Sequence, residues 1–130
     1  MRGFLLQDWI TVRAYAGGSG PTVVPAVAQG ADSWVDIGDF EDLVFTLDVR
    51  EVSSTSFSLA YETSPTRADA AFKAMLPAFR PTVGQRVDRV FSSVAGVPPA
   101  RFVRWKISCS TAGTYDLTFR IWLAAYAWVC

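Results

Sequence analysis

The chain has 130 residues, of which 51% are hydrophobic and only 18% are charged, and it contains no histidine. Twelve basic residues balance twelve acidic ones, so the formal net charge of zero gives no general attraction for nucleic acid or for an anionic membrane. The missing histidine excludes Ser-His-Asp and Cys-His catalysis and removes the commonest zinc ligand. High apolar content with little charge predicts extra buried surface, either in a large core or in a subunit interface.

The N-terminal segment, residues 1–16, is expected to be a strand or an arm, because its residues 9–15 mix apolar and polar residues at a strand-like period. The glycine-rich stretch 17–21 follows as a linker, and residues 22–130 are expected to form one β-sandwich domain. The apolar stretch 4–6 is too short for a signal peptide, and the longest apolar run, 121–130, is too short to span a bilayer. We therefore expect a protein that is made in the cytoplasm and does not enter a membrane.

Four segments alternate apolar and polar residues in the way that is typical of strands with one buried and one exposed face. They are residues 43–49, 57–63, 101–109 and 115–123. A further strand is expected at 86–92, and the turn sequence 111–114 predicts a hairpin between the last two of the four segments. The pattern predicts an all-β fold, an antiparallel β-sandwich, with jelly-roll topology as the preferred arrangement.

One short helix is expected after the second of these strands. Ser64 is a suitable N-cap, Pro65 fits the first turn, and residues 68–76 contain good helix formers before Pro77 ends them. Its buried side would consist of Phe72, Met75 and Leu76.

Five carboxylates lie close together in the sequence: Asp32, Asp36, Asp39, Glu41 and Asp42. Oxygen ligands of this kind could bind calcium on a sandwich loop, but their spacing matches no defined calcium loop, and an ordinary solvated turn around Gly38 is favoured. A hydrolase using Asp36 and Asp39 is a further alternative, although nothing in the sequence raises the pKa of one carboxyl above the other. We therefore expect no metal, no cofactor and no enzymatic activity.

A basic group is expected largely on neighbouring strands: Arg101, Arg104, Lys106 and Arg120. Arg104, Lys106 and Arg120 lie on the faces opposite the apolar residues. The group could bind an anionic group or an acidic neighbouring subunit, but a solvated outer face with cross-strand charge pairs to Asp116 is favoured.

Apolar segments stand at both chain ends, where polar residues are usual, and they either pair with the body of the chain or bind a neighbouring subunit. Trp122 lies in the polar register of its strand, so it either forms part of a second buried layer or points outward. An outward tryptophan can anchor a protein interface or stack on a sugar ring. The candidate interface residues are Phe4, Leu5, Leu6, Trp9, Trp122, Tyr126 and Trp128.

Two partial resemblances follow from particular residues. The run Ala100-Arg101-Phe102-Val103-Arg104-Trp105-Lys106-Ile107 resembles the late strand of discoidin-like, galactose-binding-like jelly rolls, which bind sugars or lipids through loops at one end of the sandwich. The junction Tyr61-Glu62-Thr63-Ser64-Pro65, with the initial methionine, the missing export signal and the apolar ends, resembles small β-sandwich accessory proteins of tailed phages, which decorate capsids or form part of the tail.

The phage resemblance implies a non-enzymatic structural protein of the virion, a capsid or decoration component made in the host cytoplasm. Its partners would be copies of itself in a homo-oligomer and a major capsid or tail protein, with no nucleic acid and no membrane. The alternative is a carbohydrate-binding module in which exposed Trp122 contacts a glycan.

Overall fold

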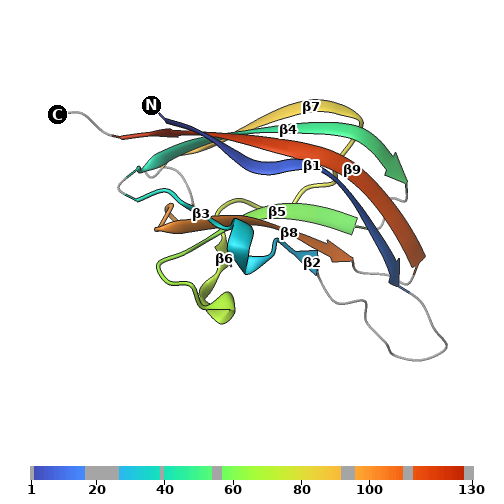
Figure 1. Ribbon diagram of the computed structural model, residues 1–130, viewed down its shortest axis with the longest axis horizontal. Coiled ribbons are helices and arrows are strands. Elements are labelled where there is room, and N and C mark those ends of the chain that lie inside the picture. The colour runs from blue at the N-terminus through green and yellow to red at the C-terminus, as the bar shows by residue number, and fades with distance from the viewer. Residues whose placement is uncertain are drawn as a thin grey trace.

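The computed structural model describes residues 2–16, 27–38, 40–53, 57–91, 96–109 and 113–127. They form two antiparallel β-sheets that lie face to face around one main core, which confirms the expected all-β sandwich (Figure 1). The linker expected at 17–21 lies outside the described residues.

Sheet A has four strands in the order β1-β9-β4-β7. Their bounds are Arg2–Ala16 for β1, Gly113–Tyr126 for β9, Asp42–Ser53 for β4 and Gly84–Val90 for β7. β1 is an edge strand that pairs antiparallel with β9 from Arg2 to Ala16, with register shifts between Leu5 and Gln7 and between Gln7 and Ile10. Of the two arrangements left open for the N-terminal segment, the structure therefore has the one in which it pairs with its own chain.

Sheet B has five strands in the order β2-β8-β5-β6, with β3 also paired to β8. The long strands are β8, Phe102–Cys109, and β5, Phe57–Ser64. The short ones are β2, Val27–Ala28, β3, Val35–Asp36, and β6, Lys73–Ala74. Two single 3-10 turns, η1 at Ala31–Ser33 and η2 at Asp69–Ala71, interrupt the segments that lead to β3 and β6.

The strand pairs identify the topology as a jelly roll. If β2 and β3 are counted as one interrupted strand, eight strands pair from the outside of the sequence inward. β1 pairs with β9, β2 and β3 with β8, β4 with β7, and β5 with β6. This is a long hairpin ribbon rolled up so that β9 also pairs with β4 and β8 also pairs with β5. The hairpin predicted at 111–114 is wrong, because β8 and β9 are the central strands of different sheets and each already has neighbours on both sides.

The core lies between the sheets, where the predicted apolar rows meet. Each of the four predicted strands contributes alternate residues to it, and the ring of Phe45 in sheet A stacks on that of Tyr61 in sheet B with centroids 4.0 Å apart. Trp105 meets Phe119 edge to face at 5.1 Å. Such aromatic pairs are each worth about 0.5–1.5 kcal/mol beyond the area that they bury, so they fix how the two sheets face each other.

The helix predicted at 68–76 is wrong; only the turn η2 and the short strand β6 occupy this segment. Ser64 does not cap a helix, because its hydroxyl donates to the carbonyl of Thr66 and accepts from the N–H of the same residue. A helix would place Phe72 and Met75 on one stripe, whereas the extended chain sends Phe72 to the outer side of sheet B and Met75 into the main core. Tertiary packing and the pairing of β6 with β5 therefore override local helix propensity.

Candidate interaction surface

A row of outward side chains crosses all four strands of sheet A. Leu5 on β1 stands opposite Trp122 on β9, Trp122 opposite Thr46 on β4, and Thr46 opposite Val87 on β7. Opposite residues in an antiparallel sheet point to the same face, so these side chains share the face that is turned away from the core.

Three members of this row and one residue farther along β9 are large, apolar and exposed: Leu5 at 42%, Trp122 at 45%, Val87 at 57% and Tyr126 at 39%. We call these four residues the sheet A patch. One other large apolar side chain among the described residues is as exposed, Val83, and it precedes β7 rather than lying within a strand. The exposed apolar side chains of the described residues are thus concentrated on one face of one sheet.

One end of the patch borders a hollow. Val87 and Tyr126 line an open depression of about 450 Å³ together with Asp42, Val44, Arg89 and Phe91. Its lining combines aromatic and aliphatic side chains with a carboxylate and a guanidinium, so it could receive a side chain of a partner or a small polar ligand.

The tryptophans of this face are held by arginines. The Arg120 guanidinium lies 4.7 Å from the ring centre of Trp9 and 5.3 Å from that of Trp122, and Arg50 lies 4.7 Å from Trp9 on β1. Arg120 is itself fixed by an ion pair with Asp48 at 3.3 Å. Cation–π contacts at partly exposed sites contribute about 0.5–1 kcal/mol each, which favours one orientation of each indole before any partner binds.

The structure separates the candidate interface residues into two groups. Leu5, Trp9, Trp122 and Tyr126 lie on the outer side of sheet A. Leu6 points inward and is fully buried in the core, and Phe4 packs against the core and edge-on against Phe40 at 6.3 Å. The seventh candidate, Trp128, lies outside the described residues.

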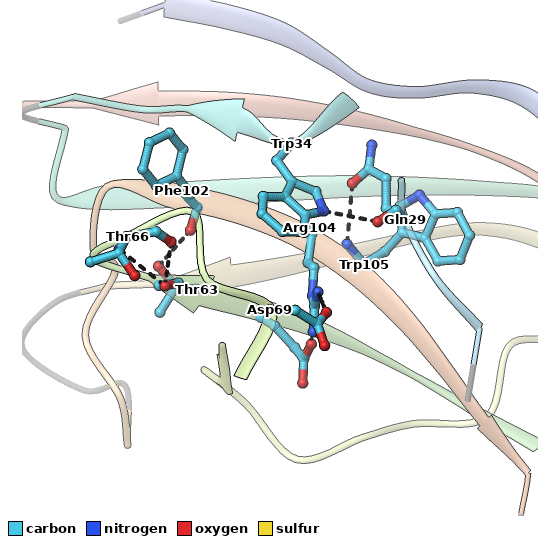
Figure 2. A network of polar contacts seen from close by, with 10 residues as sticks. Gln29, Trp34, Thr63, Thr66, Asp69, Phe102, Arg104 and Trp105 are labelled. Carbon is cyan, nitrogen blue, oxygen red and sulfur yellow. Dashed lines mark hydrogen bonds and ion pairs between the residues drawn. The ribbon is translucent and has the colours of Figure 1, made fainter. Parts of the chain in front are cut away.

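The basic group is not one surface, because Arg104 and Lys106 belong to sheet B and Arg120 to sheet A. Arg104 is only 3% exposed. Its Nε lies 2.9 Å from Oε1 of Glu62, and its Nη1 forms a second ion pair with Asp69 of η2 (Figure 2). Asp116, the partner expected for the basic group, pairs instead with Arg13 at 3.5 Å.

Aromatic rings complete the burial of Arg104 on the outer side of sheet B. Its guanidinium lies 4.0 Å from the ring centre of Phe72, and Trp34, Phe72 and Phe102 form a second apolar cluster beside it. The sequence contains one signal for this cluster: Phe102 stands in the same outward register as Arg104, where a solvated face would carry polar residues.

Gln29 fixes the segment that brings Trp34 to this cluster. The Gln29 amide donates to the carbonyls of Leu6 and Ser33, and its backbone carbonyl accepts from Nε1 of Trp34 at 2.8 Å. The backbone N–H of Trp105 donates to the side-chain oxygen of Gln29 (Figure 2). Gln29 is thus a buried junction between β1, η1 and β8, and its position in the sequence gives no sign of this role.

The acidic group forms no metal site among the described residues, which contain no set of three His, Cys, Asp or Glu side chains placed to hold an ion. Asp36 accepts from the backbone N–H of Gly38 at 2.9 Å and pairs with Arg101 at 3.2 Å. These contacts, the Gly38 N–H first, hold the pKa of Asp36 below its ordinary value. Asp39, the other carboxylate of the hydrolase alternative, lies outside the described residues.

No protein-family model matches the chain, and no curated protein matches it. Among solved structures, it is similar to a chain in the structure of infectious bursal disease virus, Gx strain, with a TM-score of 0.42 and 10% sequence identity over 96% of this chain. The chain spans 32% of the length of that viral chain. Within the described residues no helix is long and apolar enough to cross a membrane.

Proposed function

We propose that this chain is a non-enzymatic structural protein of a large assembly, a capsid or decoration component of a virion made in the host cytoplasm. It acts by binding copies of itself and a major capsid or tail protein. The observation that carries the proposal is the sheet A patch, four exposed apolar side chains gathered on one face. Jelly rolls occur in viral capsid and lectin domains alike, so the fold alone does not distinguish these functions.

The chemistry of the patch supports a protein partner. Large aromatic side chains at the centre of a surface with charged residues around them are typical of interface hot spots. Trp122 is exposed and already oriented by Arg120, so burying it against a partner costs little side-chain entropy. The zero net charge places no repulsion between copies.

The test compares two exposed valines, one inside the patch and one outside it. We expect the wild-type protein to form multimers of defined mass in light scattering over a concentration series. Val87→Ser should raise the concentration of half-assembly about tenfold, because about 1.5 kcal/mol of apolar burial is lost per interface. Val83→Ser, the matched control at 65% exposure, should leave assembly unchanged. A wild-type protein that remains monomeric at every concentration would contradict self-association.

The alternative, a carbohydrate-binding module, is favoured by one observation: the exposed Trp122 ring lies on the same face as the depression beside Tyr126. A glycan that quenches tryptophan fluorescence in wild-type protein but not in Trp122→Ala, while the protein stays monomeric, would favour it over assembly.

A further inference from the structure

The edges of the two sheets differ greatly in length. Within the described residues, sheet B ends on one side at β2 and β3, with two residues each, and on the other at β6, also with two. Sheet A ends at β7, with seven residues, and at β1, with fifteen. Natural proteins keep exposed sheet edges short because each presents unpaired N–H and C=O groups to other chains. β1 is the edge that departs from this rule.

Charged side chains oppose the pairing of another chain at the edge of β7, but not at the second half of β1. Three of the seven residues of β7 are charged, Arg86, Asp88 and Arg89, and charged side chains on an edge strand oppose pairing. Two other features oppose pairing at the first half of β1. Its register shifts between Leu5 and Ile10 make the edge irregular, and the Gln29 amide donates to the carbonyl of Leu6. From Ile10 onward β1 pairs with β9 without a shift, and Arg13 is the one charged residue of 10–16.

We infer that the edge of β1 over residues 10–16 is a strand-pairing site for a second copy of this chain, joined antiparallel about a two-fold axis. A sheet edge carries both donors and acceptors, so it is complementary to itself in the antiparallel orientation. Pairing would join two copies of sheet A into one continuous eight-stranded sheet, with the four strands of each copy in mirrored order. This inference rests on the proposed function and names one of the contacts through which the chain would assemble.

The charges of β1 restrict the register of such a pair. A pair centred on Arg13 would set the two Arg13 side chains against each other, whereas pairs centred on Thr11 or Val12 avoid this. In those registers residue 11 of one copy faces residue 11 or Arg13 of the second copy. Thr11 is exposed, and its hydroxyl lies 2.8 Å from that of Thr118 on β9.

This threonine pair provides a matched test. Thr11→Lys and Thr118→Lys lose the same hydroxyl contact and add the same charge to the same face, but only Thr11→Lys adds it at the edge. In the registers above, the new lysine faces a like charge of the second copy. We expect analytical ultracentrifugation to show a dimer for wild type and Thr118→Lys, and a dissociation constant raised roughly tenfold or more for Thr11→Lys.

Amide hydrogen exchange of the wild-type protein tests the same contact without a variant. Every second N–H in residues 10–16 faces away from β9, and these amides should exchange more slowly as protein concentration rises.

Edge pairing is overturned by concentration-independent exchange at these amides, by a Thr11→Lys protein that dimerises like wild type, or by equal dissociation in both lysine variants. If Val87→Ser still weakens assembly in that case, the proposed function stands while the edge contact falls. If only Thr11→Lys and not Val87→Ser weakens it, the edge contact stands and the role of the sheet A patch falls.

Discussion

The hydroxyl of Tyr61 is buried, and the described residues give it no hydrogen bond. Its ring stacks on Phe45 at the centre of the core, but its hydroxyl oxygen has no hydrogen-bond partner among the described residues. Burial raises the pKa of this phenol above its ordinary value. The ring therefore contributes to packing, whereas the hydroxyl loses its bonds to water on folding.

Tyr61→Phe should consequently stabilise the protein rather than destabilise it. Leaving a buried hydroxyl unsatisfied costs about 1–3 kcal/mol, so we expect the free energy of unfolding to rise by about 1 kcal/mol or more in urea denaturation. Tyr126→Phe removes a hydroxyl from an exposed side chain and should change stability little. A clear loss of stability in Tyr61→Phe would show that its hydroxyl has a partner in solution.

At the scale of elements, Arg104 joins parts of the chain that the sheets alone do not connect. It links β8 to Glu62 on β5 and to Asp69 in η2, and it packs on Phe72, which precedes β6. The segment from η2 to β6 has only two residues of strand pairing with β5. The arginine therefore contributes much of what holds this segment against sheet B.

Removing the arginine should be costly, because the buried Glu62 carboxyl would lose its ion-pair partner. We expect Arg104→Met to lower the free energy of unfolding by about 3–5 kcal/mol, and Arg104→Met with Glu62→Met to recover most of the loss. Arg101→Met, which breaks the exposed pair with Asp36, should cost no more than about 1 kcal/mol. A single variant Arg104→Met as stable as Arg101→Met would contradict this role.

The same elements show how far the sequence predicts the structure. Alternation located β4, β5, β8 and β9 because a strand with one buried face leaves a period of two in the sequence. It also placed Trp122 among outward-facing positions, and the structure shows that side chain exposed. The helix wrongly predicted at 68–76 and the hairpin wrongly predicted at 111–114 both came from local sequence signals. The sheet to which β8 or β9 belongs, and the side on which Phe72 lies, depend instead on residues far away in the sequence. The burial of Arg104 was hidden for the same reason, since its cover comes from residues 34 and 72.

For the whole molecule, the carboxylates predict how stability changes in acid. The Arg104 hydrogen bond and charge hold the pKa of Asp69 below its ordinary value, and Gly38 and Arg101 do the same for Asp36. A carboxyl whose folded pKa is lower than its unfolded pKa adds stability above the unfolded value, and this stability is lost as the pH falls through the folded value.

The free energy of unfolding should therefore fall when the pH is lowered from about 5 to below 4. Asp69→Asn should show a smaller fall, and Asp36→Asn with Asp69→Asn a smaller one still, as measured by urea denaturation at each pH. An identical acid profile in wild type and the double variant would contradict this assignment.

The rolled ribbon also determines when the fold can form. β9 is the last strand in the described chain, yet it occupies the middle of sheet A, and Arg2 pairs with Ala125 across nearly the whole sequence. Until β9 has left the ribosome, β1 lacks its partner strand in sheet A and β4 lacks one of its two partners. Closing such long loops is slow, and open strands invite wrong pairing. The completion of sheet A is thus coupled to the synthesis of β9, the strand that joins β1 to β4.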